Sequence, residues 1–242
     1  MTVDTRFFAA GPARDARFRV GEIRAEMENF DAAHPEATRE FLHRQMNEEI
    51  NGMEISARNL ADFPDAPWEL RMAMARQCWD ESRHIEMFRR CFEARGGQVG
   101  QYPVMNFQYR ILMNIDTLIG RLTVQNRSFE AAGIDAIQNE ILETARNGGQ
   151  HDLLDLFDAQ LADEVQHVRY ANRWIPRLRE LGGARSVLDI ARATAQAAEA
   201  LTIIAGDALL TYPVAEDVRR EAGFDDAEIA TAKELAASPR PT

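Results

Sequence analysis

Apolar residues recur along most of this chain at three- and four-residue spacing, the pattern of amphipathic helices, whereas the alternating runs typical of strands are nearly absent. This periodicity predicts an all-α fold. The expected long helices cover about residues 36–61, 67–95, 106–146 and 152–179, and further helical segments cover 186–210 and 214–236. Four long helices with a long crossover near residues 96–103 predict a four-helix bundle.

Glycine and proline mark the expected boundaries. Phe63–Pro67 should separate the first two helices, with Asp65 as the N-cap of the second. We expect a bend near Gly120, a perturbed helix end at Pro176, and a break at Gly182–Gly183. These features indicate one domain with three parts, namely an N-terminal arm at 1–29, the bundle at 30–180, and C-terminal packing helices or a lid at 184–242.

Composition excludes several classes of protein. A formal charge of -11 and a pI near 5.0 argue against nucleic acid as a partner, because phosphate binding requires a basic surface. No apolar run is long enough for a membrane span and no secretory signal is evident, so we expect a cytoplasmic protein. Cys78 and Cys91 lie thirteen residues apart on one predicted helix, roughly 20 Å, which excludes both a disulfide and a rubredoxin-type iron site.

A glutamate interrupts the apolar seam of each long helix. These four residues are Glu49, Glu81, Glu130 and Glu164. On the second and fourth helices the glutamate belongs to an Asp-Glu-x-x-His segment, which places a histidine, His84 or His167, on the same helical face.

The glutamates also match in depth along the expected hairpins. Glu49 lies 15 residues before the turn at Pro64 and Glu81 lies 17 after it, while Glu130 lies 18 residues before Gly148 and Glu164 lies 16 after it. Antiparallel helices bring together residues equally distant from their turn. We therefore expect Glu49 beside Glu81, and Glu130 beside Glu164.

Four buried carboxylates require a cationic partner, because an unpaired buried charge is strongly destabilising. Two divalent metal ions would neutralise them. Oxygen donors with one imidazole per ion suit iron or manganese better than a tetrahedral structural zinc site. The sequence thus predicts two Fe ions, with Mn or a mixed Fe/Mn pair as the alternative, terminal or bridging roles for Glu49 and Glu130, and open positions for O₂ as co-substrate.

Residues around these ligands have candidate roles too. Asp80 and Asp163 are expected to accept the Nδ1 hydrogen of a ligand histidine from the opposite motif, and Arg83 to pair with one of them. Tyr170, one turn beyond His167, is a candidate redox tyrosine, with an ordinary buried tyrosine as the alternative. His43 lacks ligand spacing and is expected at the surface or in a cap.

A substrate pocket is predicted beside the metals. Gly52 and Gly133, each three residues after a seam glutamate, would leave room for a small molecule. Large apolar side chains on the inner faces would line the pocket, with core packing as the alternative interpretation; these are Met46, Met53, Phe88, Phe129 and Phe157.

At these motifs the chain resembles the ferritin-like di-iron carboxylate superfamily, which includes ferritins, rubrerythrins, ribonucleotide reductase small subunits, bacterial multicomponent monooxygenases and aldehyde-deformylating oxygenases. The Asp-Glu-x-Arg-His at residues 80–84 resembles the oxygen-activating members. More narrowly, His43, Glu49 and Glu54 followed by Phe-Pro-Asp-Ala-Pro at 63–67 are similar to a bacterial ferritin-like group of unknown function.

The resemblance covers about residues 40–180. It implies the same six ligands as the helical pattern, namely Glu49, Glu81, His84, Glu130, Glu164 and His167. Gln166 stands where the first motif has Arg83, so the two halves are expected to differ around the ligands.

The resemblance implies a non-haem di-metal oxidoreductase, an O₂-activating oxidase or oxygenase that hydroxylates, desaturates or N-oxygenates a small organic substrate. No flavin or nicotinamide motif is visible, so an external electron donor or the substrate itself should supply electrons. Two alternatives remain open: an iron-handling or peroxide-removing protein, as in ferroxidases and manganese catalases, and a non-enzymatic helical interaction protein. A homodimer is the expected assembly.

Overall fold

The computed structural model describes residues 11–12, 14–205 and 212–237, and these are mostly helical. Contacts within the chain divide it into two compact units. Unit 1 consists of Met1–Leu118 and Arg192–Leu209, and unit 2 consists of Ile119–Ala191 and Leu210–Thr242. The all-α prediction is confirmed, whereas the single domain and the bundle remain predictions.

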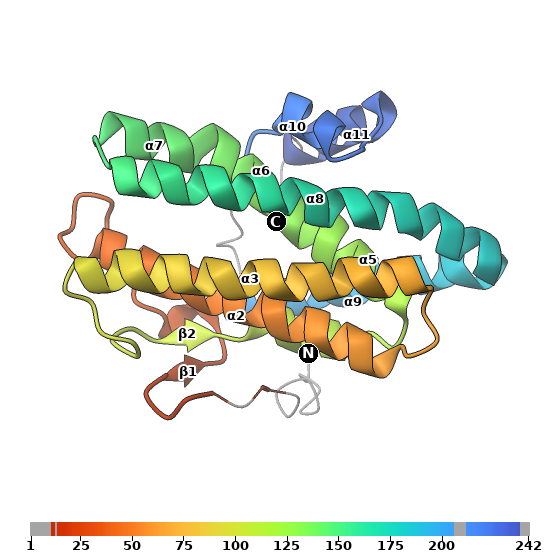
Figure 1. Cartoon of the computed structure of the whole chain (residues 1–242), viewed down its shortest axis with the longest axis horizontal. Coiled ribbons are helices and arrows are strands. Elements are labelled where there is room, and N and C mark those ends of the chain that lie inside the picture. The colour runs from red at the N-terminus through yellow and green to blue at the C-terminus, as the bar shows by residue number, and fades with distance from the viewer. Residues whose placement is uncertain (1–10, 13, 206–211, 238–242) are drawn as a thin grey trace. The chain divides into compact units, whose positions relative to one another are not determined.

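The central feature of unit 1 is a hairpin of two long helices, α2 (Ala37–Asp62) and α3 (Trp68–Ala94), which pack side by side (Figure 1). Their bounds agree with the predicted helices to within a residue or two. The expected N-cap Asp65 is wrong, because the turn closed by the Ala66 N–H on the Phe63 carbonyl continues to Pro67, which is the N-cap of α3.

Apolar side chains of both helices build the core of this hairpin. Leu42 and Ile55 of α2 and Leu70, Met74 and Phe88 of α3 are completely buried. They recur at helical spacing, so each helix directs one apolar face to the other. The hairpin thereby fixes the level at which residues of α2 meet residues of α3.

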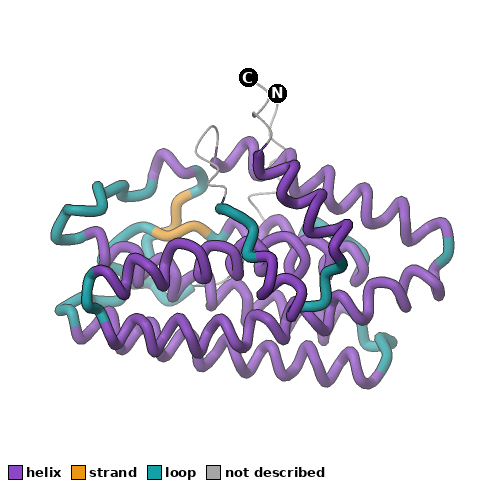
Figure 2. Tube along the Cα trace, turned by 90° about the horizontal axis from the view of Figure 1, so that it is seen from above, coloured by secondary structure: helices purple, strands orange, loops and turns teal. Residues whose placement is uncertain are grey.

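Short elements complete unit 1. A two-residue strand β1 (Val20–Gly21) pairs in parallel with β2 (Val104–Met105), and both stand out in orange in Figure 2. The remaining elements are the short 3₁₀ helix η1 (Arg24–Glu26), the helix α4 (Phe107–Met113), and the part of α9 (Ala184–Ala205) that begins at Arg192. Strand pairs this short carry no periodic signal, and the sequence pattern did not predict them.

Unit 2 contains a second helical hairpin. Its first arm is a continuous helical run in which α and π segments alternate; its second arm is α8 (His151–Gly182), and the arms meet at Gly148–Gln150 (Figure 1). The segments of the first arm are α5 (Leu118–Val124), the π-helix η2 (Gln125–Glu130), α6 (Ala131–Ala136), the π-helix η3 (Ile137–Ile141) and α7 (Leu142–Asn147).

Two expected interruptions fall elsewhere. The helix predicted at 106–146 breaks between Met113 and Leu118, where the side chain of the C-cap Asn114 donates to the Arg110 carbonyl at 2.8 Å, whereas Gly120 lies inside α5. Pro176 lies within α8, which continues to Gly182. The proline removes only one backbone hydrogen-bond donor, and the helix resumes beyond it.

Two short helices, α10 (Glu216–Glu221) and α11 (Asp226–Ala237), form the C-terminal part of unit 2. Arg219 of α10 binds Asp135 of α6 through both oxygens, at 3.0 and 2.5 Å, and Asp135 also accepts the Ala215 N–H at 2.9 Å. This buried carboxylate attaches the C-terminal helices to the first arm.

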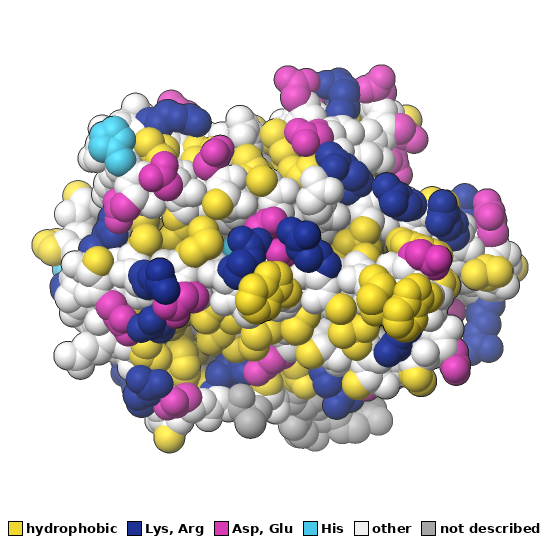
Figure 3. Space-filling view, in the orientation of Figure 1, with side chains coloured by type: hydrophobic (Ala, Val, Ile, Leu, Met, Phe, Trp, Pro, Cys, Tyr) yellow, Lys and Arg dark blue, Asp and Glu magenta, His cyan; other side chains and the backbone are white. Residues whose placement is uncertain are grey.

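The outer face of α3 carries exposed apolar side chains. Trp68 and Trp79 are 67% and 63% exposed, and Met72 on the same face is exposed too. The space-filling view shows apolar side chains gathered over this helix (Figure 3). None of the helices in the described part of the chain is both long and apolar enough to cross a membrane.

Candidate metal centre

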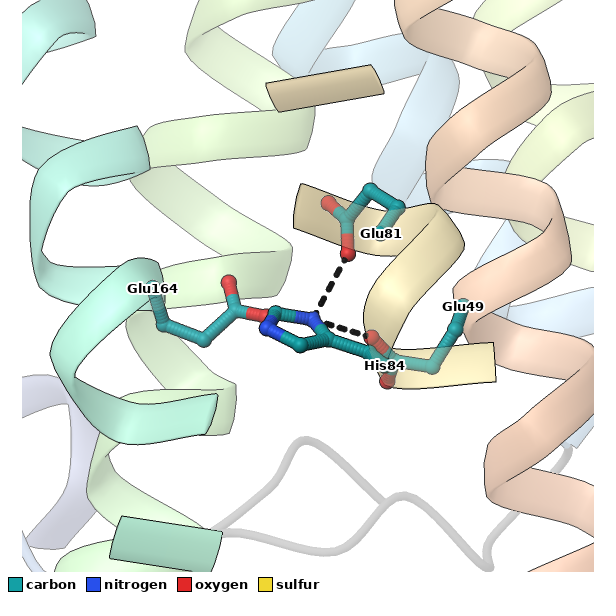
Figure 4. Close-up of side chains that lie close together, drawn as sticks. All are labelled: Glu49, Glu81, His84 and Glu164. Atoms are coloured by element: carbon teal, nitrogen blue, oxygen red, sulfur yellow. Dashed lines mark hydrogen bonds and ion pairs between the residues drawn. The ribbon is translucent and has the colours of Figure 1, made fainter. Parts of the chain in front are cut away.

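Three predicted ligands lie together in unit 1. Glu49 comes from α2, and Glu81 and His84 come from consecutive turns of α3; all three are buried. Each offers a ligand atom within 4.8 Å of the others. His84 Nδ1 lies 3.0 Å from Glu49 Oε2 and 3.2 Å from Glu81 Oε2 (Figure 4). We call this group the first cluster.

The orientation of His84 differs from the expectation that its Nδ1 would face an aspartate. A carboxylate accepts hydrogen bonds but does not donate them, so the Nδ1 between Glu49 and Glu81 carries the ring hydrogen here. His84 follows Glu81 by three residues on the same face, and the ring nitrogen nearer its backbone therefore reaches the carboxylates. Nδ1 is the atom that a metal ion would bind in this cluster.

Two further residues position the Glu81 carboxylate. Gln77, one turn earlier on α3, donates its amide to Glu81 Oε1 at 3.0 Å. Gly52 of α2 lies against the same oxygen, because a Cβ at position 52 would stand 3.0 Å from Glu81 Oε1 and 3.1 Å from its carboxyl carbon. The missing side chain of Gly52 makes room for the carboxylate itself.

The sequence carries a signal for Gln77 that lies outside the Asp-Glu-x-x-His motif. A glutamine precedes the ligand glutamate by four residues in both motifs, as Gln77 before Glu81 and Gln160 before Glu164. The repeated segment is thus Gln-x-x-Asp-Glu-x-x-His. Gln160 is buried like Gln77.

Asp80 is held by two guanidinium groups. It is 1% exposed and accepts Arg76 Nε at 2.7 and 2.9 Å and an Arg83 N–H at 2.7 Å. The expected pairing of Arg83 with one motif aspartate is therefore present. Arg76 was missed, although its four-residue spacing from Asp80 on one helix is a recognisable ion-pair signal. The role of Asp163, which is half-buried, remains a prediction.

The other three predicted ligands belong to unit 2. Glu130 ends the π-helix η2, and Glu164 and His167 lie on α8; all three are buried. Glu130 and His167 offer ligand atoms within 4.8 Å of each other, and His167 Nδ1 lies 3.5 Å from Glu164 Oε2. We call this group the second cluster.

Amide side chains hold both oxygens of Glu130. Gln125 donates to Oε1 at 3.2 Å and Asn126 donates to Oε2 at 2.7 Å. These donors precede Glu130 by five and four residues. A regular α-helix places only one of them on the face of Glu130, whereas the wider π turn brings both to it.

Asn126 also connects this cluster to Tyr170. Its amide lies 3.3 Å from the His167 carbonyl oxygen and 3.4 Å from the Tyr170 hydroxyl. Tyr170 is half-buried. The Tyr170 hydroxyl thus lies within hydrogen-bond distance of Asn126, whose amide holds Glu130. The redox role of Tyr170 remains a prediction.

The predicted pocket residues divide by burial. Met46, Gly52, Phe88 and Phe157 are buried, whereas Met53, Phe129 and Gly133 are half-buried. A cavity of about 350 Å³ in unit 2 has none of them in its lining, which consists of Gln138, Asn139 and Val214–Val218. Their role in binding a substrate remains a prediction.

His43 is a core residue, and its expected place at the surface is wrong. It is completely buried among the rings of Phe92 and Tyr102, and its Nε2 accepts the Gly100 N–H at 2.8 Å. Burial, with a smaller contribution from the charge of Arg19, lowers the pKa of His43 to about 4. A neutral imidazole therefore attaches the crossover segment to α2.

The described chain is thus a mostly helical protein with buried clusters of glutamate and histidine whose geometry could hold metal. It belongs to a family described as "Protein of unknown function (DUF455)", whose model matches residues 3–230. No curated protein and no solved structure matches the chain.

Proposed function

We propose that the two clusters combine into one two-metal carboxylate centre inside a ferritin-like four-helix bundle, and that the protein is a non-haem O₂-activating oxidase or oxygenase. The observation that carries this proposal is the burial of four carboxylates beside two histidines. Glu49, Glu81, Glu130 and Glu164 are each less than 10% exposed, and the histidines are almost completely buried.

The donor set fits two divalent ions. Four carboxylates carry four negative charges, which two such ions neutralise, and buried carboxylates without compensation would destabilise the fold. Glu49, Glu81 and His84 would hold one ion, and Glu130, Glu164 and His167 would hold the other. Oxygen donors with a single imidazole per ion favour iron or manganese. When bound, the two ions supply redox chemistry and open coordination positions for O₂.

The chain's own residues would bind the metal ions, orient the ligand carboxylates and shield the centre from water. In unit 1, Gln77 and Gly52 fix the Glu81 carboxylate, and the guanidinium groups of Arg76 and Arg83 hold the buried Asp80 carboxylate by hydrogen bonds. Buried apolar side chains such as Phe88 in unit 1 and Phe157 in unit 2 would exclude water from a reactive centre. A small organic substrate would lie against these side chains, and a separate protein would deliver electrons.

The test is metal content together with oxygen consumption. Glu81→Ala and Glu164→Ala should each lose the ion of their own cluster, and with it the O₂ uptake of the iron(II)-loaded protein. Glu86→Ala is the matched control, because Glu86 lies on α3 but its side chain is 41% exposed and pairs with Arg89 and Arg90. Full metal content and O₂ uptake in either ligand variant would contradict the proposal.

The same experiment distinguishes the proposed function from iron storage. Iron(II) oxidation that stops near two ions per chain indicates a resident centre. Continued oxidation and uptake of many more ions would instead indicate an iron-handling protein. Rapid disproportionation of peroxide without any organic substrate would indicate a catalase.

A further inference from the structure

The two clusters contain the same ligand types but hold them differently. In the first cluster, Glu49 Oε2 and Glu81 Oε2 both lie within 3.2 Å of His84 Nδ1, so three prospective ligand atoms converge on one point. In the second cluster the corresponding histidine nitrogen is 3.5 Å from Glu164, and the two oxygens of Glu130 accept the amides of Gln125 and Asn126.

From this difference we infer that the two metal positions are inequivalent: the Glu49–Glu81–His84 cluster binds the first ion, and the Glu130–Glu164–His167 cluster binds the second ion more weakly. The inference rests on the proposed two-metal centre and adds an order of loading to it.

The first cluster already holds its three ligand atoms together, and an ion there would take the place of the Nδ1 hydrogen that His84 shares with Glu49 and Glu81. Glu81 receives the Gln77 amide on Oε1 and turns its other oxygen, Oε2, toward His84. The amide thus orients the carboxylate so that Oε2 faces His84 Nδ1, the position that a metal ion would take. Gly52 allows this carboxylate to lie against α2.

The second cluster must change before it binds an ion with full strength. Both oxygens of Glu130 already share their charge with amide hydrogens, and a metal ion there competes with these bonds. Separating an amide from the carboxylate would leave a buried donor without its acceptor, which is unfavourable. The π turn maintains this competition, because it brings two amides to one carboxylate.

Manganese(II) is a suitable probe, because one isolated bound ion and a pair of adjacent ions have different electron paramagnetic resonance spectra. Titrated into the full-length protein after metal removal, the first equivalent should give the spectrum of an isolated ion. The signal of a coupled pair should appear only with the second. We expect the first ion to bind at least about tenfold more tightly, the effect of one disrupted buried hydrogen bond.

Two matched histidine variants assign the order. His167→Ala should keep one tightly bound manganese with an affinity close to that of the unmodified protein, while His84→Ala should lose the tight ion. Asn126→Leu should narrow the difference between the two affinities, because Glu130 then loses one competing amide. Retention of the tight ion by His84→Ala would overturn the inference, and so would an unchanged difference in Asn126→Leu.

Both histidines are buried, so a variant could fail to fold, and a second measurement uses the unmodified protein. In crystals grown with one equivalent of manganese, anomalous scattering should place the ion beside Glu49, Glu81 and His84. An ion beside Glu130 and His167, or equal occupancy of both positions, would overturn the proposed order of loading but not the proposed two-metal centre. Binding of no manganese or iron at either position would overturn the proposed function as well.

Discussion

The two clusters contain the same types of ligand but lie in different helical environments. The first lies between two regular α-helices, where a glycine of α2 makes room for a carboxylate of α3. The second takes Glu130 from a π segment, and the altered turn adds two amide donors to it. Equal ligands therefore do not make equal sites. The backbone that carries them decides which neighbours each carboxylate has.

Metal removal should have the largest effect. Complete chelation should lower the melting temperature by about 5–10 °C, because binding at a hundred times the dissociation constant contributes about 3 kcal/mol in a chain of this size. A weak chelator such as citrate should remove one ion first and lower the melting temperature only in part. Differential scanning calorimetry with metal analysis measures both steps.

Glu81→Ala should show only a small change in melting temperature on chelation, since it is expected to lose the tightly bound ion and to keep at most the weakly bound one. A single loss of both ions at every citrate concentration would remove the distinction between the clusters.

The next effect is a pH dependence centred on His43 in unit 1. Its pKa in the folded protein, about 4, lies below the ordinary value of 6.5, so the unfolded chain binds the proton more readily. The stabilisation is therefore complete above pH 6.5 and is lost as the pH falls toward 4. It amounts to at most about 3 kcal/mol.

Urea unfolding of the metal-free protein at pH 7 and pH 4.5 measures this dependence. His43→Met keeps the volume but does not titrate, and its stability should fall less between the two pH values than that of the unmodified protein. Equal losses in both proteins would assign the acid sensitivity to other groups. Hydrogen exchange should show the acid-induced opening first in the α2–α3 hairpin.

A pair of glycines tests the two clusters directly. Gly52→Ala adds a Cβ about 3.0 Å from Glu81 Oε1, so the carboxylate must move, and metal affinity should fall about tenfold. Gly133→Ala, at the equivalent position after Glu130, meets no atom within 4 Å and should bind metal normally. It should even be slightly more stable, by about 0.4–1 kcal/mol, because alanine restricts the unfolded chain. Isothermal titration with manganese compares the two, and equal affinities would contradict the close approach of α2 and α3.

The last comparison is between the two motif aspartates. Asp80→Asn removes the charge that two guanidinium groups share and should cost about 1–2 kcal/mol in the free energy of unfolding. Asp163→Asn should cost less, because Asp163 is only half-buried. Chemical denaturation measures both, and the reverse order would show that burial is not the deciding factor.

Long-range regularity made part of this structure predictable from sequence. Strong helical periodicity located α2, α3 and α8 to within a few residues, and the Glu and His spacing selected the residues that meet in unit 1. Features without a periodic pattern were not predictable from the sequence. The β1–β2 pair has two residues per strand, and nothing in its sequence distinguishes it from a loop.

Local context decided the remaining differences. Residues 125–130 carry ordinary helical periodicity, and a π turn adds one residue without disturbing the apolar pattern enough to be noticed. The burial of His43 depends on Phe92, Tyr102 and the Gly100 N–H, which lie far along the chain, so its local sequence does not distinguish it from a surface or capping histidine. The glutamine before each motif is detectable in the sequence, because it stands four residues before the glutamate in both copies.

The second π segment, Ile137–Ile141, acts as a length correction within unit 2. Counted along the sequence, Glu130 lies 18 residues before Gly148 but Glu164 only 16 residues after it, so two uniform α-helices would place them about 3 Å apart along the hairpin. A π turn packs about one additional residue into the same rise. The longer arm is thereby shortened toward the length of its partner. A one-residue deletion between Glu130 and Gly148 should thus be tolerated best where it restores a regular helix, within Ile137–Ile141.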